Sequence, residues 1–552
     1  MRAATLSFGS VAALALLVSL PAAGRAQAQM ALEGAVRSAE EGPMEGVLVS
    51  AKKAGSTITV SVSTDDKGHY GFPAARLAPG HYELAIRAVG FELDGAKAAD
   101  VAPGQAASAD LQLRKTKKLV AQLTNAEWMA SAPGTDQQRQ FLSNCVDCHT
   151  VQRIFQSTHD ANEFQQVFVR MSGYSPGSVP THPQPTVGGP QRPFGTKEQM
   201  QPIAEWLASI NLSEGQSWEY PLKTLPRLTG RATHAIVTEY NLARPDAQPH
   251  DVVVDPDGIV WYADFGQQFL GSLDPKTGKV TDYPLPVVKP GFPTGSLDLE
   301  LDPDGNLWIA MMYQTGVARF DRKTRQFTLF PLPKEWQADH TQESMVSPTY
   351  LKVDGKVWSN NQDMHALYRL DVASGNWENL GPVKELSGRG INAYGMPSDQ
   401  GNNLYLMAFG GSDLGRLAAK TKLLTLYPTP TQFARPRRGR VDAENNLWFA
   451  EYNGNAIAKF DSKTEKISEW RLPTPFSDPY DVAPAKNGEV WTGSMLTDRV
   501  ARLDPKTGSF VEYQLPRETN IRRVFVDDRT TPNTLWVGSN HGASIVKVEP
   551  LD

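Results

Sequence analysis

The two cysteines of this chain lie three residues apart and are followed directly by a histidine, in the segment Cys145-Val146-Asp147-Cys148-His149. Two thiols at this spacing can form thioethers with the two vinyl groups of one porphyrin, and the following imidazole is then held under the iron. The pattern is typical of c-type haem attachment. We therefore expect Cys145 and Cys148 to bind haem c covalently and His149 to be the proximal ligand of its iron.

Two other functions of a cysteine pair need features that this sequence does not have. A structural zinc site needs four ligands, and the sequence has no second cysteine pair. A thioredoxin-like redox pair belongs in a βαβ unit, whereas residues 135–150 have a helical pattern and more predicted helix follows. A structural disulfide across so short a loop is the remaining alternative.

The second axial ligand of the iron would be a methionine or a histidine, and methionine raises the reduction potential relative to histidine. Met171 directly follows a predicted helix over residues 162–170 and is our first candidate. Met200 lies at a commoner sequence distance from His149, but it falls inside a predicted helix over residues 197–210. An open sixth position, or ligation by His159 or His182, is also consistent with the sequence.

The composition is that of a soluble globular protein, with 40% hydrophobic and 21% charged residues in 552. A chain of this length predicts about two to four domains. The formal net charge of -5 gives no basic surface for nucleic acid, so we expect no nucleic-acid partner. The 45 glycines, 40 prolines and 12 tryptophans indicate many turns and a large β region.

The first 28 residues have the pattern of a signal peptide. Arg2 supplies a positive charge, residues 11–20 are apolar, and Ala26-Gln27-Ala28 resembles a cleavage site. The apolar run is too short for a membrane-spanning helix. We expect a secreted, periplasmic protein with no transmembrane segment after cleavage, with an uncleaved anchor as the alternative.

Residues 31–114 alternate between short strand patterns and turns, as in the turn at Asp65-Asp66-Lys67-Gly68. Through Gly46-Val47, Gly68-His69-Tyr70-Gly71-Phe72 and Gly80-His81-Tyr82, this segment resembles the carboxypeptidase regulatory-like domain. The resemblance implies a small β-sandwich without catalytic residues.

Residues 130–213 contain the Cys-x-x-Cys-His motif between helical patterns and end on a predicted helix that carries Glu205-Trp206-Leu207-Ala208-Ser209-Ile210. This order of elements resembles a small, all-α class I cytochrome c domain. The resemblance implies one haem and a periplasmic redox partner.

An aromatic residue recurs every 43 to 50 residues in the last part of the chain, each time in the same local setting. Its seven occurrences are Trp261, Trp308, Trp358, Tyr405, Trp448, Trp491 and Trp536. Seven repeats of this period predict a seven-bladed β-propeller over residues 236–552. The last repeat is one strand short, and we expect residues 236–242 to supply that strand and close the ring. The predicted fold is thus mainly β, with one small helical domain.

The propeller resembles the streptogramin (virginiamycin B) lyase family, through residues 261–264, 447–451, 455–460 and the Gln-Pro-His-Asp of residues 248–251. That family opens a cyclic depsipeptide ester by elimination, with a histidine as base and acidic residues with Mg²⁺ stabilising charge. The resemblance implies His250 as base, Asp264 and Glu451 as acids, and Mg²⁺ as a possible cofactor. The equivalent positions of other repeats carry no further histidine: Thr294, Thr349, Arg437, Tyr480 and Arg522.

Three functions follow from these features. The first is a periplasmic mono-haem c-type cytochrome fused to a ligand-binding propeller, which would serve in electron transfer or as a haem-dependent oxidoreductase with a small-molecule ligand at the propeller channel. The second is a virginiamycin B lyase-like C–O lyase with an accessory cytochrome. The third is a non-catalytic binding or scaffold protein. Fold analogy alone does not choose among them.

Overall fold

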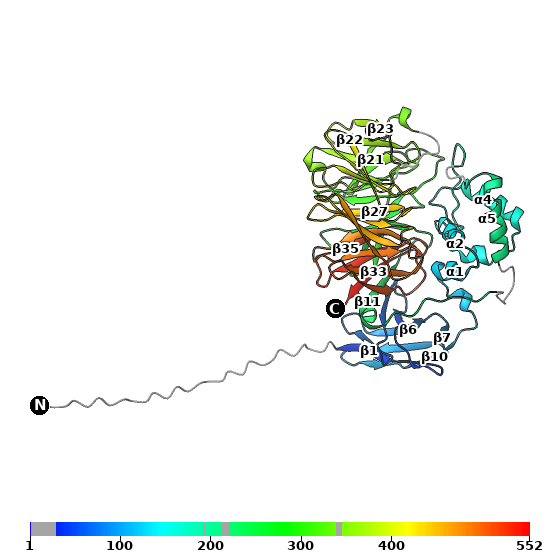
Figure 1. Cartoon of the computed structure of the whole chain (residues 1–552). Helices are drawn as coiled ribbons and strands as arrows, with labels where there is room; N and C mark the ends of the chain where they lie inside the picture. The colour runs from blue at the N-terminus through cyan, green and yellow to red at the C-terminus, as the bar shows by residue number, and fades with distance from the viewer. Residues whose placement is uncertain (2–28, 191–193, 212–219, 338–344) are drawn as a thin grey trace.

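A computed structural model describes Met1 and residues 29–190, 194–211, 220–337 and 345–552. The predicted signal peptide at residues 1–28 lies almost wholly outside the described residues. A stack of β-sheets forms the bulk of the molecule, helices cover one of its faces, and a β-sandwich lies at its base (Figure 1). Within the described ranges, no helix is long and apolar enough to cross a membrane.

The N-terminal part is the β-sandwich that residues 31–114 predict. One sheet has the path β2-β1-β10-β7, with β5 and β9 also paired to β1, and the other contains β4-β3-β6-β8. The strands are β1 (Met30–Ser38), β2 (Gly42–Pro43), β3 (Leu48–Lys53), β4 (Ile58–Ser63), β5 (His69–Pro73), β6 (Gly80–Arg87), β7 (Phe91–Leu93), β8 (Lys97–Val101), β9 (Ala107–Ser108) and β10 (Leu111–Lys115). Leu32, Val49 and Phe72 are among the side chains of its core.

The middle part contains five α-helices in its described residues. They are α1 (Asn125–Ser131), α2 (Asp136–Phe141), α3 (Gln152–Phe155), α4 (Ala161–Ser172) and α5 (Lys197–Ile210). A capping box opens α1, α2, α4 and α5, with Thr124, Thr135, Asp160 and Thr196 as the N-cap residues. The helices predicted over residues 162–170 and 197–210 are confirmed.

The helical pattern over residues 135–150 does not form one helix, and on this point our prediction was wrong. After α2 the chain makes a short 3-10 turn, η2 (Leu142–Asn144), and the Cys-x-x-Cys-His motif lies in the turns that follow. The cause is local competition by polar side chains. The Ser143 hydroxyl donates to the Gln140 carbonyl at 2.8 Å, and the Asn144 amide donates to the Phe141 carbonyl at 3.0 Å.

Seven sheets of the described residues form the propeller, as the aromatic repeat predicts. Each of the seven aromatic residues lies on a strand of its own blade, from Trp261 on β13 to Trp536 on β36. Tyr405 lies on the first strand of the fourth blade, and each of the others lies on a strand between two neighbours of its sheet. The first three blades are β12 (Pro249–Val254), β13 (Val260–Asp264), β14 (Phe269–Asp274) and β15 (Lys279–Pro284); β16 (Leu299–Leu301), β17 (Leu307–Ala310), β18 (Val317–Asp321) and β19 (Gln326–Phe330); and β20 (Val346–Ser347), β21 (Lys356–Asn361), β22 (Ala366–Asp371) and β23 (Trp377–Gly381).

The fourth blade has three strands, β24 (Leu404–Met407), β25 (Asp413–Leu417) and β26 (Leu424–Pro428). The fifth and sixth are β27 (Pro436–Val441), β28 (Leu447–Glu451), β29 (Ala456–Asp461) and β30 (Lys466–Arg471); and β31 (Pro479–Pro484), β32 (Val490–Ser494), β33 (Arg499–Asp504) and β34 (Ser509–Gln514). The seventh contains β35 (Ile521–Asp527), β36 (Thr534–Ser539) and β37 (Ser544–Pro550).

The ring closes through β11 (Ala235–Asn241), which pairs antiparallel with β37, so the predicted closing strand is confirmed. The other edge of β11 pairs with β4 of the sandwich. Val237 thus lies between Val548 of the propeller and Ser61 of the sandwich. One eight-stranded sheet, β35-β36-β37-β11-β4-β3-β6-β8, runs from the seventh blade into the sandwich and removes an exposed edge from each.

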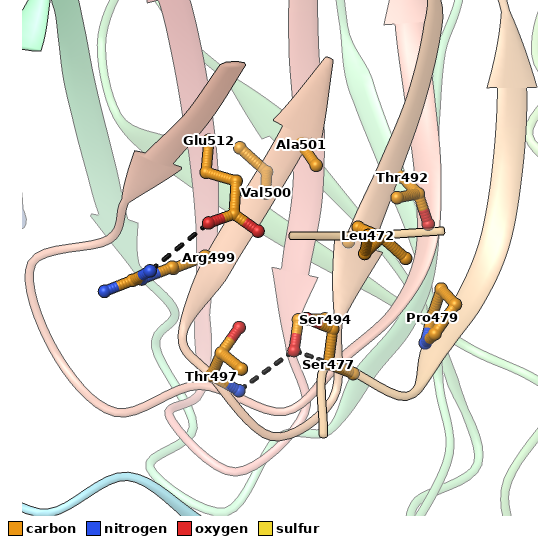
Figure 2. Close-up of a pocket in the computed structure, with 11 residues that line it drawn as sticks. Leu472, Ser477, Pro479, Thr492, Ser494, Thr497, Arg499, Val500, Ala501 and Glu512 are labelled. Carbon is orange, nitrogen blue, oxygen red and sulfur yellow. Dashed lines mark hydrogen bonds and ion pairs between the residues drawn. The ribbon is translucent and has the colours of Figure 1, made fainter. Parts of the chain in front are cut away.

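The sixth blade adds polar contacts at the same junction. Figure 2 shows Arg499 paired with Glu512 at 3.2 Å, beside the Ser494 hydroxyl, which donates to the Ser477 carbonyl. Arg499 also donates to the Pro226 carbonyl at 2.8 Å, and Arg87 of the sandwich pairs with Asp498 at 2.6 Å. These contacts fix the sandwich and the linker against the propeller.

We expect Val237→Asp to destabilise the protein by about 3–5 kcal/mol, because it places an unpaired carboxylate in the buried centre of the shared sheet. Val169→Asp, at a side chain that is 74% exposed on α4, is the matched control. Denaturant unfolding followed by circular dichroism measures both changes. Equal stability of the two variants would contradict a structural role for β11.

Candidate functional site

The helical segment packs on one face of the propeller and shares a core with it (Figure 1). A single apolar cluster includes Trp128 and Phe155 of the helices together with Tyr452, Tyr480 and Leu496 of the propeller. A backbone hydrogen bond from Ala126 to the Leu496 carbonyl, at 2.9 Å, crosses the same interface. The two parts therefore form one packed unit around the motif.

The turn that carries the motif is held by the seventh blade. Arg522 pairs with the Asp147 carboxylate at 3.2 Å and donates to the Asp147 carbonyl at 3.2 Å. Nε2 of His541 donates to that same carbonyl at 3.2 Å, and the Asn520 amide donates to the Val146 carbonyl at 3.2 Å. The propeller thus binds the two residues between the cysteines, Val146 and Asp147, by hydrogen bonds and an ion pair.

The two thiols of the motif are not linked to each other, and its histidine is held through one ring nitrogen. Cys145 and Cys148 are half-buried and not joined in a disulfide. Burial raises the pKa of Cys145 to about 12, with Asp147 and Cys148 adding to the effect. The Nδ1–H of His149 donates to the Thr150 carbonyl at 2.8 Å, and within the described residues Nε2 has no hydrogen-bond partner. A histidine anchored in this way presents the lone pair of its other nitrogen to a ligand.

A cavity of about 440 Å³ lies between the helical segment and the propeller, which is the size of a ligand or cofactor site. Cys148, His149 and Thr150 line it, with Val179 to Thr181 beside them. The propeller contributes Pro245 to Gln248, Arg517, Glu518 and Asn540 to Gly542. Two of the residues predicted to hold haem therefore face a space that the propeller helps to enclose.

The candidates for the second axial ligand lie elsewhere. Met200 is buried in the apolar cluster of the helices, and Met171 is half-buried in the last turn of α4. Neither is among the residues that line the cavity. His159 pairs with Glu163 at 3.7 Å, and His182 lies in a turn closed by hydrogen bonds with Val179. The identity of the distal ligand stays a prediction.

His250 lies at the centre of the propeller and is completely buried. Its Nδ1–H donates to Asp251 at 2.5 Å, and its Nε2 accepts from the Tyr480 hydroxyl at 3.0 Å. The Tyr480 hydroxyl in turn contacts that of Tyr394. Burial lowers the pKa of His250 to about 3, and the positive charge of Arg522 adds to this shift. The imidazole is therefore neutral, and both of its nitrogens are occupied by the protein.

Three of the residues at equivalent repeat positions, Tyr480, Arg437 and Arg522, lie around His250. The Arg437 guanidinium lies 3.8 Å from the centroid of the Tyr480 ring, and that of Arg522 lies 5.4 Å from it. Beneath them, Arg438 and Arg523 pair with Asp251 and Asp298 in a buried ionic network. Although burial opposes ionisation, Arg438 and His250 hold the pKa of Asp251 well below its ordinary value. Asp251, Asp298, Arg438 and Arg523 thus pair with one another next to His250.

The two predicted acidic partners lie in other surroundings. Asp264 is buried and pairs with Arg244 at 2.6 Å, while its other oxygen accepts backbone N–H groups. Burial raises the pKa of Asp264 even so. Glu451 is also buried, and burial with the nearby Glu469 raises its pKa to about 9, so Glu451 is protonated at neutral pH.

These side chains do not suit Mg²⁺, which needs several carboxylate or carbonyl oxygens free to coordinate it. The oxygens of Asp264 are taken by Arg244 and backbone amides, and Glu451 is uncharged. No group of three acidic, histidine or cysteine side chains in the described part of the chain forms a metal-ligand cluster.

Comparison with known proteins supports two of the three resemblances. A family model for the virginiamycin B lyase family matches residues 382–551, and one for the carboxypeptidase regulatory-like domain matches residues 31–114. Both matches agree with the sequence-based resemblances of the propeller and the sandwich. Neither covers residues 130–213, so the cytochrome c domain stays a prediction. His250 and Asp264 also lie outside the matched part of the propeller.

Solved structures give further likenesses in fold. Virginiamycin B lyase from Staphylococcus aureus, in selenomethionine form, is 20% identical, with a TM-score of 0.49 over 57% of this chain and 99% of its own. A streptogramin B lyase is 23% identical, with a TM-score of 0.49 over 58% of this chain and 100% of its own. YCF48 bound to D1 peptide is 15% identical, with a TM-score of 0.42 over 57% and 94% of the two chains. A comparison with curated proteins finds no match.

The sequence alone does not predict the contacts between the seventh blade and the Cys-x-x-Cys-His motif. Asp147 and Arg522 are separated by 375 positions, and no local pattern relates them. Arg522 itself was visible as a repeat-equivalent position, and this was the one available signal. Asn520, Asn540 and His541 lie in connections between strands, where composition carries little information about contacts.

Asp478 should make stability depend on pH at this interface. Burial raises its pKa to about 7, and its carboxyl accepts from the Gln140 side chain of α2 at 3.2 Å. Because the folded state then binds a proton more tightly than the unfolded chain, the free energy of unfolding falls as pH rises from about 4 to about 7. The contribution approaches about 1.4 kcal/mol per pH unit.

Asp478→Asn keeps a neutral amide in this place, so we expect it to remove that contribution and to gain stability over the unmodified protein above neutral pH. Asp100→Asn, at a side chain that is 85% exposed, is the control. Urea unfolding at a series of pH values measures the difference. An unchanged pH profile in Asp478→Asn would show that this carboxyl is not protonated in the fold.

Proposed function

We propose that this chain is an exported mono-haem c-type cytochrome whose helical segment is built onto a propeller, and that it functions in electron transfer or as a haem-linked oxidoreductase. One observation carries the proposal. His149, directly after Cys148, lines a cavity with its Nδ1–H anchored on a backbone carbonyl and its Nε2 left for a ligand.

The residues present fit covalent haem. Both thiols are reduced, and thioether formation on one porphyrin requires two free thiols at this spacing. The cavity has apolar walls from Val179, Pro180, Pro245 and Ala247 and polar walls from the propeller. Cys145 and Cys148 would hold the group, His149 would be its proximal ligand, and Met171 or, alternatively, Met200 its distal ligand. A bound haem would supply one-electron transfer through its iron.

The chain's own residues would keep such a group rigid. Arg522, Asn520 and His541 hold the carbonyls of Val146 and Asp147, so the backbone between the thiols cannot move without breaking buried hydrogen bonds. The Thr150 carbonyl fixes the plane and tautomer of the His149 ring. A rigid ligand set reduces the rearrangement that accompanies a change of charge, which suits electron transfer. A periplasmic redox partner follows from the same proposal.

The first test is co-expression with haem-maturation machinery, followed by a denatured haem assay and a reduced-minus-oxidised spectrum. We expect covalent haem in the unmodified protein, its loss in Cys145→Ser with Cys148→Ser, and a changed spectrum in His149→Ala. His234→Ala, at an exposed position of the linker, is the control. A protein that matures without covalent haem would overturn the proposal.

The distal ligand is tested in the same preparations. We expect Met171→Leu to lower the midpoint potential and to remove the spectral features of methionine ligation, because methionine raises the potential. Met200→Leu, which keeps the bulk of a buried side chain, should leave the spectrum unchanged. The reverse result would assign the ligand to Met200, and no effect of either variant would exclude both.

A second candidate is C–O lyase activity of the virginiamycin B lyase type, which the family match to residues 382–551 favours. His250 would be the base that removes a proton as the ester C–O bond breaks. The contacts of His250 oppose this role, because a base must reach the proton that it removes. Its Nε2 is occupied by Tyr480, and the helical segment packs over the same face. We therefore rank this function second.

Quinupristin is the compound present in a structure of catalytically inactive virginiamycin B lyase from Staphylococcus aureus. Incubation with quinupristin, with the product followed by mass spectrometry, tests the second candidate. If the propeller is a lyase, His250→Ala abolishes ring opening, while the double cysteine variant and His234→Ala retain it. From the burial of His250 we expect no ring opening by any of these proteins. Turnover that depends on His250 would reverse the ranking.

A further inference from the structure

Much of the wall of the cavity next to the motif comes from the propeller. Three connections contribute: the one before β12 with Pro245 to Gln248, the one before β35 with Arg517 and Glu518, and the turn between β36 and β37 with Asn540 to Gly542. The cavity therefore opens between residues 148–181 of the helical segment and residues of the first and last blades of the propeller.

Several polar atoms of these connections are buried without a hydrogen-bond partner. Asn540 is 1% exposed, and both its side-chain oxygen and nitrogen are unpaired within the described residues. Oε1 of Gln248 and Nδ1 of His541 are also buried and have no hydrogen-bond partner within the described residues. Because a buried polar atom left unpaired destabilises the fold, this set indicates a molecule that the cavity is built to hold.

The backbone keeps Asn540 in place. Its N–H donates to the Asn520 carbonyl at 3.2 Å, and the Asn520 side chain donates to Val146 of the motif. The next residue, His541, donates to the Asp147 carbonyl. The turn that presents the unpaired amide is thus bonded directly to the segment between the two cysteines.

The lining combines two chemical characters. Val179, Pro180, Pro245 and Ala247 offer apolar surface, and the Asn540 amide offers a donor that has no partner within the described residues. Arg517 pairs with Glu239 at 2.6 Å, and Asp246 and Glu518 also line the cavity. A molecule with a flat apolar body and an anionic edge matches the apolar surface and the donor of Asn540. Haem has this character, because its porphyrin ring carries two carboxylate groups.

We propose that the seventh blade forms the second wall of the haem site, with Asn540 as a positioning residue whose amide donates to a haem carboxylate. This inference rests on the proposed function. It gives the propeller a direct role at the redox centre: the blade holds the segment between the thiols and also donates a hydrogen bond to the edge of the group that the thiols bind.

The reduction potential reports this contact. A donor to a haem carboxylate offsets its negative charge, and the reduced iron carries one positive charge fewer than the oxidised iron. Loss of the donor therefore disfavours reduction. We expect Asn540→Leu to shift the one-electron equilibrium toward the oxidised form about tenfold, which corresponds to about 59 mV lower potential.

Asn533→Leu is the matched control. Asn533 is also an asparagine of the seventh blade with a buried, unpaired amide nitrogen, but it lies at the opposite end of β36. Asn540→Asp is a second variant that preserves shape and places a negative charge in the cavity, so its potential should fall further. Potentiometric titration of the haem-loaded full chain, with circular dichroism of each variant, measures these effects.

The outcomes separate the two proposals. A potential that falls in both Asn540 variants and is unchanged in Asn533→Leu supports the second wall. Covalent haem with equal potentials in the Asn540 variants and the control overturns this inference and leaves the proposed function standing. A chain that carries no covalent haem overturns both.

Discussion

The buried guanidinium of Arg522 is the constraint on which much of the central structure depends. The side chain is 2% exposed, and a charge removed from water to this degree costs several kcal/mol unless it is paired and hydrogen-bonded. Its partners are the Asp147 carboxylate, the Asp147 carbonyl and the Asn520 side chain. Two of these belong to the Cys-x-x-Cys-His segment. The propeller therefore needs the helical segment in place to neutralise its own charge, and the motif obtains a fixed backbone in return.

The same arginine shapes the chemistry at His250. Arg522 lies close enough to lower the pKa of that imidazole further, and the helical segment excludes water from the face above it. A histidine in such a setting is a weak base, and its hydrogen bonds to Asp251 and Tyr480 use both nitrogens. One interface thus forms the cavity beside His149 and shares its apolar cluster with Tyr480, the partner of His250. This is why the geometry favours chemistry at the interface over chemistry in the channel.

Repeated and local features could be predicted from the sequence, because each blade encodes its own strands and turns. Trp261 and its six equivalents gave the number of blades, and the unpaired strand pattern before the first blade gave the closure by β11. The family matches support the sandwich and the propeller. Long-range features could not be predicted in this way. No periodicity links Asp147 to Arg522 or β4 to β11. The helical pattern before Cys145 also does not show the side-chain hydrogen bonds of Ser143 and Asn144, which compete with the helix.

The shared sheet gives the N-terminal sandwich a structural part in the site. β11 hydrogen-bonds to β4 on one edge and to β37 on the other, and β37 follows the turn that contains Asn540 and His541. Arg76 of the sandwich also pairs with Glu549 at the end of β37. An edge strand left unpaired would expose a row of backbone groups and loosen the last blade. Because that blade holds the Cys-x-x-Cys-His segment, a module without catalytic residues of its own contributes to the rigidity of the proposed haem site through continuous backbone hydrogen bonding.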